Sequence, residues 1–497
     1  MTVADDRQAL ERFPSTDPAT GEVIATWPID DERSIAETVD RARLAAQWWA
    51  DLGFAGRRER LLAWRGVLAR RVRQLGHLMH RENGKPLDDA TLEAILAIDH
   101  LDWAAKHARK VLGPRTVRPS LLSANQQAWL EYQPLGVIGV IGPWNYPVFT
   151  PMGSIAYALA AGNAVVFKPS EYTPGVGAWL VETFAEVVPE QPVLQLVTGF
   201  GATGAALCRS GVDKVAFTGS TATGKKVMSA CAERLTPVLV ECGGKDALIV
   251  DADADLDAAA DAAAWGGLSN AGQTCTGIER VFVADAVYEP FLAKLVERVR
   301  ELRPGSDPHA SYGPITMPSQ VDVIRRHIEE AIERGGRAVV GGPQAVRPPF
   351  VDPVVLVDVP EDSPANTEET FGPTLSVTRV RDVDEAVDRV NGGLYGLGAA
   401  VFAKRRGMEL ARRLRTGMTS VNSAISFATV PALPFGGVAD SGFGRIHGAD
   451  GLKEFTRAKA ITRQRFGLPV PLTSFDRAPE TVDRIVWLVG VLYGRRR

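Results

Sequence analysis

The sequence predicts an α/β protein with parallel β-sheets, and three observations support this. Short apolar segments rich in β-branched residues recur after about residue 130, at 136–141, 164–167, 215–217, 238–240 and 247–250. Segments with helical spacing of apolar residues lie between them, such as 222–233 and 255–265. This alternation is typical of βαβ units, in which the strands run parallel. The chain has 497 residues, enough for two to four domains.

Helices are expected on both sides of this region. Residues 33–49 carry apolar side chains at helical spacing, and residues 57–82 predict a second amphipathic helix. Asn83-Gly84-Lys85-Pro86 ends that helix with a glycine stop and a following proline. A second α/β region is expected downstream, including residues 286–303, 319–334 and 384–391.

The composition and the two ends of the sequence bear on binding partners, metal sites and cellular location. Hydrophobic residues make up 45% and charged residues 23%, and the formal net charge is −3, which attracts no nucleic acid. The four cysteines form no CxxC pair, so we expect no metal site and a reducing compartment. The start, MTVADD, lacks the pattern of a signal peptide, and no run approaches the roughly 20 apolar residues of a spanning helix. We therefore expect a cytoplasmic protein.

The C-terminal tail, residues 481–497, is unusual. Ile485–Gly494 is apolar apart from the phenol of Tyr493, and three arginines follow. One interpretation is a helix that docks on the protein's own surface or on another subunit. The other is an interfacial anchor that makes a peripheral membrane contact, with its arginines among the headgroups.

Cys275 is a candidate nucleophile. It lies in a Gly-, Ser- and Thr-rich turn, Ser269-Asn270-Ala271-Gly272-Gln273-Thr274-Cys275-Thr276. A lone cysteine is more often a small buried hydrophobe, so a catalytic role requires a base and a donor for an oxyanion.

Three segments offer such partners. Pro143-Trp144-Asn145-Tyr146-Pro147 follows an expected strand, and its prolines could fix the Asn145 amide as an oxyanion donor, although turns commonly contain Asn. Glu241 ends another expected strand, where burial would raise its pKa towards that of a general base; an exposed strand-end Glu is the alternative. Glu369 lies near the ring of Phe371 in an expected turn.

Two further segments could bind a dinucleotide. Residues 215–226 read as strand, Gly-rich turn and helix, and the N–H groups at the helix start suit a phosphate. The spacing is close to a P-loop but has Lys226 where a Mg²⁺-binding hydroxyl is required, and GxGxxG is missing. Lys168 and Glu171 end a strand and could reach a ribose diol, where Glu171 would repel a 2′-phosphate and favour NAD over NADP. A solvated Lys/Glu turn is the alternative.

Taken together and in this order, the motifs resemble those of the aldehyde dehydrogenase superfamily, of the NAD-dependent, hydrolytic, non-acylating type. PWNYP, KPSE, FTGSTATG, ECGGK, SNAGQTC, EETFGP, and PFGG with SGFGR extend from about Pro86 to Lys459. The resemblance implies that Cys275 is the nucleophile, that Glu241 activates the deacylating water, and that Asn145 forms the oxyanion hole with the Cys275 N–H. It implies cofactor contacts at Trp144, Lys168, Glu171, Gly201, Gly219, Ser220, Gly224, Glu369 and Phe371, and a substrate tunnel bordered by Phe435.

The same resemblance implies a fold with two open parallel-sheet domains and a small β element. Residues 1–111 and 135–243 would form a Rossmann-like NAD-binding domain, and residues 244–445 the catalytic domain. Residues 112–134 and 446–466 would form an oligomerisation element, which makes a homodimer or homotetramer expected. Residues 467–497 would be a C-terminal extension with an apolar helix.

Departures from the family pattern bear on the substrate. Ile446-His447 follows Gly444-Arg445 where many members have Glu, so a proton-relay carboxylate is missing, and Cys242 replaces a usual Leu. Residues 423–433 contain no Arg or Lys to hold a second carboxylate, and Phe149, Phe427 and Phe435 favour an apolar, aliphatic or aromatic aldehyde. The alternatives are a succinate-semialdehyde dehydrogenase, a CoA-acylating enzyme, a nucleoside triphosphatase using residues 219–226, and a catalytically silent relative.

Overall fold

The computed structural model describes residues 10–467 and 474–494. The chain divides into two compact units, which we describe separately. Unit 1 contains the residues up to Val111 and those from Pro134 to Thr456. Unit 2 contains Leu112–Gln133 and the residues from Arg457 onward.

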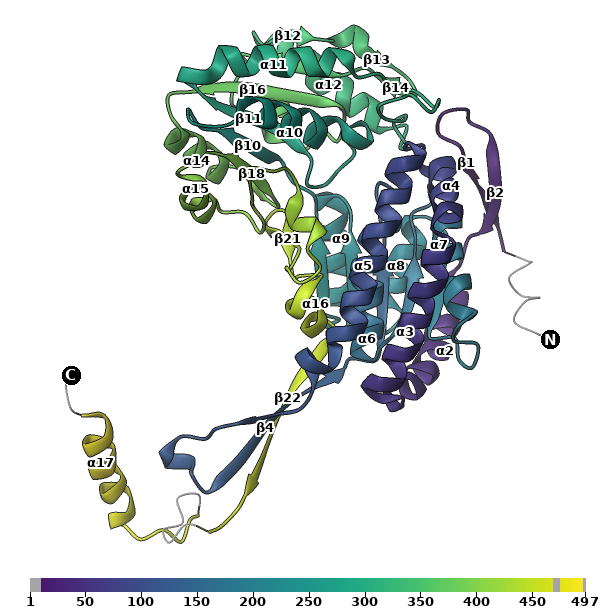
Figure 1. Cartoon of the computed structure of the whole chain (residues 1–497). Helices are drawn as coiled ribbons and strands as arrows, with labels where there is room; N and C mark the ends of the chain where they lie inside the picture. Colours follow the sequence, from purple (N-terminus) through teal and green to yellow (C-terminus); the bar gives the residue numbers. More distant parts are fainter. Residues whose placement is uncertain (1–9, 468–473, 495–497) are drawn as a thin grey trace. The chain divides into compact units, whose positions relative to one another are not determined.

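The first sheet of unit 1 has six strands in the order β21-β9-β8-β5-β6-β7. Figure 1 labels its edge strand, β21. β5 (Val137–Ile141), β6 (Ala164–Lys168), β7 (Leu194–Leu196), β8 (Lys214–Thr218) and β9 (Val238–Glu241) are parallel, and β21 (Gly442–Phe443) adds an antiparallel edge. The predicted parallel α/β sheet is confirmed. Its inner strands are almost fully buried, which explains their continuous apolar runs.

Helices cover this sheet and supply its connections. They are α2 (Glu32–Asp51), α3 (Gly53–Arg70), α4 (Val72–Asn83), α5 (Leu87–Leu112), α6 (Phe149–Ala161), α7 (Pro174–Ala185), α8 (Gly201–Arg209) and α9 (Thr221–Ala232). The single helix predicted over 57–82 is wrong: the segment forms two helices separated at Arg71. Gly84 ends α4 in the left-handed conformation, φ 87°, which confirms the predicted glycine stop.

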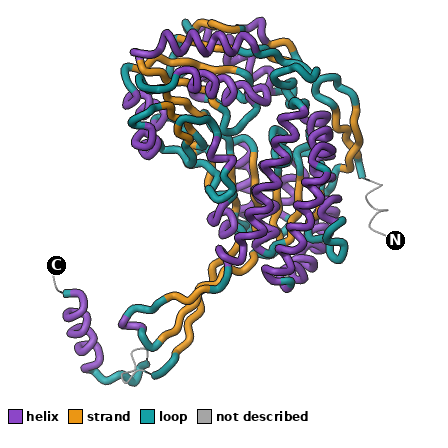
Figure 2. Tube along the Cα trace, in the orientation of Figure 1, coloured by secondary structure: helices purple, strands orange, loops and turns teal. Residues whose placement is uncertain are grey.

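The second sheet of unit 1 has seven strands in the order β12-β15-β16-β11-β10-β18-β19. β10 (Asp246–Val250), β11 (Ile278–Ala284), β15 (Val354–Val357), β16 (Thr374–Val380), β18 (Ala399–Phe402) and β19 (Ser420–Val421) are parallel, and β12 (Arg337–Val340) is antiparallel. The helices of this region are α10 (Leu256–Leu268), α11 (Tyr288–Glu301), α12 (Gln320–Glu333), α14 (Val383–Asn391) and α15 (Gly407–Arg413). Figure 2 shows helices and strands alternating along the chain here.

Smaller elements complete unit 1. They are the hairpin β1 (Arg12–Thr16) and β2 (Val23–Pro28), the pairs β13 (Val346–Arg347) with β14 (Phe350–Val351) and β17 (Tyr395–Gly396) with β20 (Val438–Ala439), and the helices α13 (Pro364–Thr367) and α16 (Gly448–Glu454). A short 3₁₀ helix, Ser269–Gly272, lies just before Cys275 and is part of the loop that carries it.

Unit 2 contains a three-stranded sheet and the C-terminal helix. The strand order is β22-β4-β3, with β3 (Arg115–Val117), β4 (Gln126–Pro134) and β22 (Thr456–Gln464). Helix α17 (Glu480–Tyr493) exposes its large apolar side chains, among them Val486 at 63% and Trp487 at 70%. Within the described residues, no helix combines the length and hydropathy needed to cross a membrane.

Candidate active site

A cavity of about 590 Å³ in unit 1 brings most of the predicted site residues together. It opens beyond the carboxyl ends of β5, β6, β8 and β9, which is where open α/β sheets bind ligands. All three predicted catalytic residues line it, and so do all but one of the predicted cofactor residues: Asn145, Glu241, Cys275, Trp144, Lys168, Glu171, Gly201, Gly219, Ser220, Glu369 and Phe371.

Gly224 is the exception, because it packs behind the cavity wall. A Cβ on Gly224 would lie 2.6 Å from the Cys242 sulfur and 3.1 Å from a Val240 methyl group. The glycine therefore lets α9 approach β9, as a dinucleotide turn requires of one of its glycines. Cys242 is buried against this helix, and burial raises the pKa of its thiol to about 12. Ser220 caps α9 by accepting the Thr223 N–H, which fixes the helix start at the cavity.

The Cys275 loop is held in an unusual backbone conformation. Asn270 and Ala271 have φ values of 51° and 57° inside the 3₁₀ turn before it. The Gln273 side chain fixes the turn, because it donates to the Pro314 carbonyl at 3.1 Å and accepts from the Thr316 N–H at 2.8 Å. Cys275 is consequently the one partly exposed cysteine; the other three are buried.

Asn145 lies directly beside this loop. Its side-chain amide donates one hydrogen bond to the Gln273 carbonyl at 3.0 Å. A primary amide has two N–H groups, so a second donor remains for a ligand in the cavity. The Asn145 carbonyl accepts from Lys85 at 2.8 Å and from Asn270 at 3.1 Å, which fixes the residue from behind.

Glu241 has the environment of a general base. It ends β9, is buried, and accepts the Gly243 N–H at 3.2 Å. Burial raises the pKa of its carboxyl to about 7, while the hydrogen bonds from Gly243 and from the Cys275 thiol act in the opposite direction. A carboxyl group with a pKa near neutrality exchanges protons readily at physiological pH.

The Cys275 thiol is held in its protonated form. Burial raises its pKa well above the usual value, and the charges of Glu241, Glu369 and Asp246 raise it further; the N–H of Thr276 acts weakly in the opposite direction. A thiol must lose its proton to attack, and the adjacent Glu241 carboxylate is the group within hydrogen-bonding reach that could accept it.

A buried ion pair that the sequence analysis did not predict fixes the loop that contains Glu369, Thr370 and Phe371. Glu279 accepts the N–H groups of Thr370 and Phe371, at 2.9 and 2.9 Å, and pairs with Lys245. Glu369 accepts the Gly244 N–H at 3.1 Å. Lys245, the lysine of the ECGGK motif, could have indicated this ion pair in the sequence, because a lysine just before a buried strand requires a partner.

The opposite part of the cavity suits a ribose. Lys168 is buried, and its ammonium group donates to the Pro169 carbonyl at 3.2 Å and lies 3.9 Å from Glu171. Burial lowers the pKa of Lys168, with Glu171 acting in the opposite direction. Hydroxyl groups of a diol would supply the acceptors that this ammonium group lacks, so the residues fit a nicotinamide dinucleotide.

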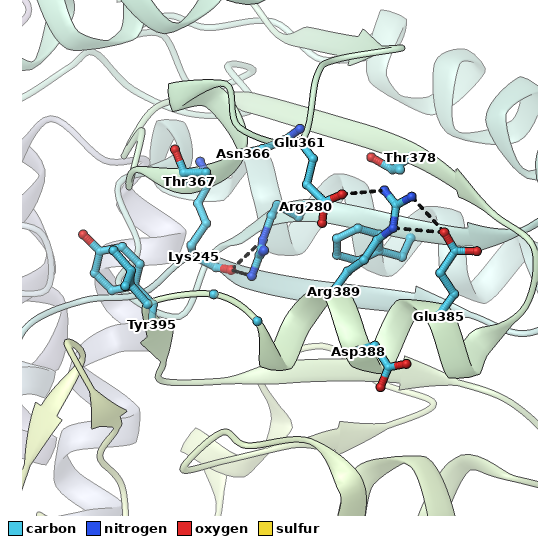
Figure 3. Close-up of a pocket in the computed structure, with 14 residues that line it drawn as sticks. Lys245, Arg280, Glu361, Asn366, Thr367, Thr378, Glu385, Asp388, Arg389 and Tyr395 are labelled. Carbon is cyan, nitrogen blue, oxygen red and sulfur yellow. Dashed lines mark hydrogen bonds and ion pairs between the residues drawn. The ribbon is translucent and has the colours of Figure 1, made fainter.

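Figure 3 shows a second cavity in unit 1, of about 440 Å³, beside the second sheet. Arg280 donates two hydrogen bonds to the Lys245 carbonyl, at 2.7 and 3.0 Å, and Arg389 pairs with Glu385 and Glu361. The cationic groups of this cavity therefore bind groups of the protein itself, and Arg280 fixes the backbone just before β10.

Three aromatic residues were expected to favour an apolar aldehyde: Phe149, Phe427 and Phe435. They belong to a cluster that does not line the first cavity. The rings of Phe427 and Phe435 lie 6.3 Å apart, and His447 lies 5.6 Å from Phe435 and 3.9 Å from His100. Burial lowers the pKa of His447 well below its usual value, and so does His100. Ile446 pairs through its backbone with Phe435 and contributes no carboxylate.

These features define an α/β protein whose cavity brings a cysteine, a buried glutamate and an asparagine together, and the comparisons give the particular family. The aldehyde dehydrogenase family model matches residues 4–461, and the chain belongs to this family. Enzymes of the family oxidise aldehydes to carboxylic acids with a nicotinamide cofactor.

The chain is 35% identical to a 4,4′-diapolycopene aldehyde oxidase of Methylomonas sp., over 96% of this chain and 90% of that protein. It is also 35% identical to a protein of Sinorhizobium fredii named probable succinate-semialdehyde dehydrogenase, NADP(+), over 93% of this chain and 94% of the other. Among solved structures, the NADP-dependent glyceraldehyde-3-phosphate dehydrogenase of Bacillus halodurans is 31% identical, with a TM-score of 0.87 over 93% of this chain and 97% of that one.

The carboxyl groups around Cys275 make its alkylation strongly pH-dependent. We expect slow reaction with iodoacetamide at pH 8 and a steep rise at higher pH, because the raised pKa leaves little thiolate. Glu241→Gln should increase the rate at pH 8 several-fold, because it removes a charge that raises the pKa of the thiol. Mass spectrometry of the Cys275 peptide measures the rate, with Cys275→Ala as background. An unchanged rate in Glu241→Gln would contradict the electrostatic coupling.

Proposed function

We propose that this chain oxidises an aldehyde with NAD and releases the carboxylic acid by hydrolysis of a thioester on Cys275. The observation that carries the proposal is that Cys275, Asn145 and Glu241 line one cavity, in which burial raises the pKa of the Glu241 carboxyl to about 7. A nucleophile, a base and an oxyanion donor are the three groups that this chemistry requires.

The first step forms a bond between the Cys275 sulfur and the aldehyde carbon, while Glu241 accepts the thiol proton. The oxygen of the resulting thiohemiacetal carries negative charge, which the free N–H of Asn145 and the backbone N–H of Cys275 stabilise. The bound nicotinamide ring supplies the hydride acceptor. Loss of hydride from the thiohemiacetal leaves a thioester on Cys275.

The second step releases the acid. After Glu241 has released the thiol proton to solvent, its carboxylate removes a proton from water, and the water oxygen bonds to the thioester carbon. The carbon–sulfur bond then breaks, the acid leaves, and the Cys275 thiolate takes the proton from Glu241. The raised pKa of Glu241 suits it to this step without a relay carboxylate at position 446. It also argues against a CoA-acylating enzyme, because an active base here would hydrolyse the thioester.

An apolar, aliphatic or aromatic aldehyde is the substrate class we favour. The segment Ser423–Leu433 has no cationic side chain, and Phe427 packs with Phe435 there. Succinate semialdehyde is the second candidate, because a relative of similar identity carries that substrate in its name. Its distal carboxylate would need a cationic partner from elsewhere in the protein.

Activity on a panel of aldehydes tests the proposal. The purified protein should form NADH with medium or long aliphatic aldehydes or benzaldehyde, and should do so less efficiently with succinic semialdehyde. Cys275→Ala should abolish turnover. Glu241→Gln should lower kcat by about 10²-fold or more, because both steps use this carboxylate as a base. The wild-type rate should rise with pH through about 7, because Glu241 must be ionised to act as a base.

Two results would overturn this proposal. One is acyl-CoA as the product in the presence of CoA. The other is turnover that survives Cys275→Ala.

We further propose that NAD is the preferred cofactor. Glu171 lines the cavity beside Lys168, and its side chain is 33% exposed, so its carboxyl group is accessible to a ligand in the cavity. A 2′-phosphate would place about −1.5 to −2 of charge against this group, whereas a 2′-hydroxyl would donate a hydrogen bond to it. Two of the relatives described above carry NADP in their names, which makes the measurement necessary.

Exchange of Glu171 tests the cofactor preference. The wild-type enzyme should show a higher kcat/KM with NAD than with NADP. Glu171→Gln keeps the size and hydrogen bonding of the side chain but removes its charge, so it should raise kcat/KM for NADP about tenfold or more while changing that for NAD less. Initial rates with both cofactors measure the ratio. A ratio unaffected by the substitution would exclude Glu171 as its cause.

We propose domain roles that follow the two sheets. Residues 1–111 and 135–243 would bind NAD, residues 244–445 would carry the nucleophile, and residues 112–134 with 446–466 would join subunits of a homodimer or homotetramer. A flat three-stranded sheet with an exposed edge is a frequent site of association between chains. We place the protein in the cytoplasm, with a peripheral contact to membranes.

That peripheral contact is assigned to α17. The helix exposes Val486, Trp487 and Tyr493, and Arg495–Arg497 follow in the sequence. Exposed apolar side chains beside cationic residues bind anionic lipid surfaces.

Vesicle binding tests this assignment. The full-length protein should sediment with vesicles of phosphatidylcholine and phosphatidylglycerol, and less with phosphatidylcholine alone. Removal of residues 481–497 should abolish binding and leave kcat unchanged. Replacement of the three arginines by Gln should remove the dependence on phosphatidylglycerol. Equal sedimentation of the truncated protein would show that α17 does not mediate the contact.

A further inference from the structure

A buried ion pair lies behind the proposed oxyanion donor. Lys85 follows the left-handed Gly84 at the junction of α4 and α5, and Glu93 lies two turns along α5. Their side chains are each 1% exposed, and the Lys85 ammonium group bonds to the Glu93 carboxylate. Burying two charges costs free energy that their attraction seldom recovers in full, so such a pair often serves a purpose besides stability.

Lys85 makes three contacts, and two of them are with the Asn145 loop. It donates to the Asn145 carbonyl at 2.8 Å, and it lies 4.1 Å from the centre of the Tyr146 ring. The third contact is the bond to Glu93. The ammonium group has three N–H donors, so Glu93 and Asn145 together with the ring face use its full capacity.

Glu93 holds the other end of the same loop. One of its oxygens accepts the N–H of Val148 at 2.8 Å and the N–H of Phe149 at 3.0 Å. These N–H groups lie at the start of α6, where the helix has no carbonyl partners for them. The loop from Asn145 to Phe149 is thus bound at both ends by one ion pair.

We propose that Lys85 and Glu93 are positioning residues that set the Asn145 amide for the oxyanion. The inference rests on the proposed function, in which Asn145 stabilises the thiohemiacetal oxygen. The backbone of Asn145 is bonded on one side to Lys85 and on the other, through Asn270 and Gln273, to the Cys275 loop. Displacement of the loop would move the amide relative to the Cys275 sulfur, and errors of about 1 Å in such a position can cost about 10²-fold in rate.

A double-mutant cycle separates positioning from stability. Asn145→Ala should lower kcat by about 10²–10³-fold, as for the loss of one oxyanion donor. Glu93→Gln alone should lower kcat about tenfold or more with little change in the KM for NAD. In the Asn145→Ala background, Glu93→Gln should have no further effect on kcat, because the group it positions is gone.

Glu454→Gln is the matched control. Glu454 forms a largely buried pair with Lys214, at the start of β8, and makes no bond to the Asn145 loop. The substitution removes one carboxylate charge from a lysine pair, although Glu454 is 24% exposed and Glu93 only 1%. Its effect on kcat should be small and should be the same in both backgrounds. Thermal unfolding of all variants reports the cost to stability.

A second variant covers the case in which Glu93→Gln does not fold. Lys85→Met/Glu93→Leu replaces both charges with apolar groups of similar size, and we expect it to be about as stable as the wild type. Its kcat should remain at least about tenfold low, because the bonds to Asn145, Val148 and Phe149 are absent. Wild-type kcat in this variant would overturn the inference.

The outcomes also separate this inference from the proposed function. If Glu93→Gln and Asn145→Ala reduce kcat independently, the ion pair does not act through Asn145, while the role of Asn145 stands. If Asn145→Ala leaves kcat unchanged, the proposed oxyanion donor itself is wrong, and the positioning role fails with it.

Discussion

Buried glutamates that accept consecutive backbone N–H groups hold the site together. Glu93 binds the N–H groups of Val148 and Phe149, and Glu279 binds those of Thr370 and Phe371. Each is paired with a buried lysine, Lys85 or Lys245, that contacts the same loop. A carboxylate can satisfy two unpaired donors at once, which backbone carbonyls in a loop rarely achieve. Loops that carry reactive groups are thereby fixed without being part of a helix or sheet.

This arrangement has an electrostatic consequence for the nucleophile. Glu241, Glu369 and Asp246 surround Cys275, and their charges add to burial in raising the thiol pKa. A raised pKa favours the protonated thiol, which is less nucleophilic than the thiolate. Reactivity then depends on a change in the local charge, such as the entry of the positively charged nicotinamide ring, or on direct proton transfer to Glu241.

The sequence alone was sufficient to predict the two sheets and most of the residues that line the cavity. Strands buried on both faces are continuously apolar, and the motifs follow the carboxyl ends of β5, β6 and β9, which meet at one edge. It was insufficient where a position depends on packing. The break at Arg71 has no proline or glycine to announce it, and Gly224 resembles a phosphate-binding glycine although it contacts Cys242.

The supporting ion pairs were beyond sequence reasoning for a related reason. Lys85 appeared in the sequence only as part of a helix stop, and Glu93 as one polar position among many on α5. Their relation to the Asn145 loop arises because α5 runs beside the loop that follows β5, and the bonds join residues 55 to 60 positions apart. The Gly84 turn makes this possible, since its left-handed conformation reverses the chain and directs Lys85 inward. A residue that appears only to end a helix thus places the charge that fixes the oxyanion loop.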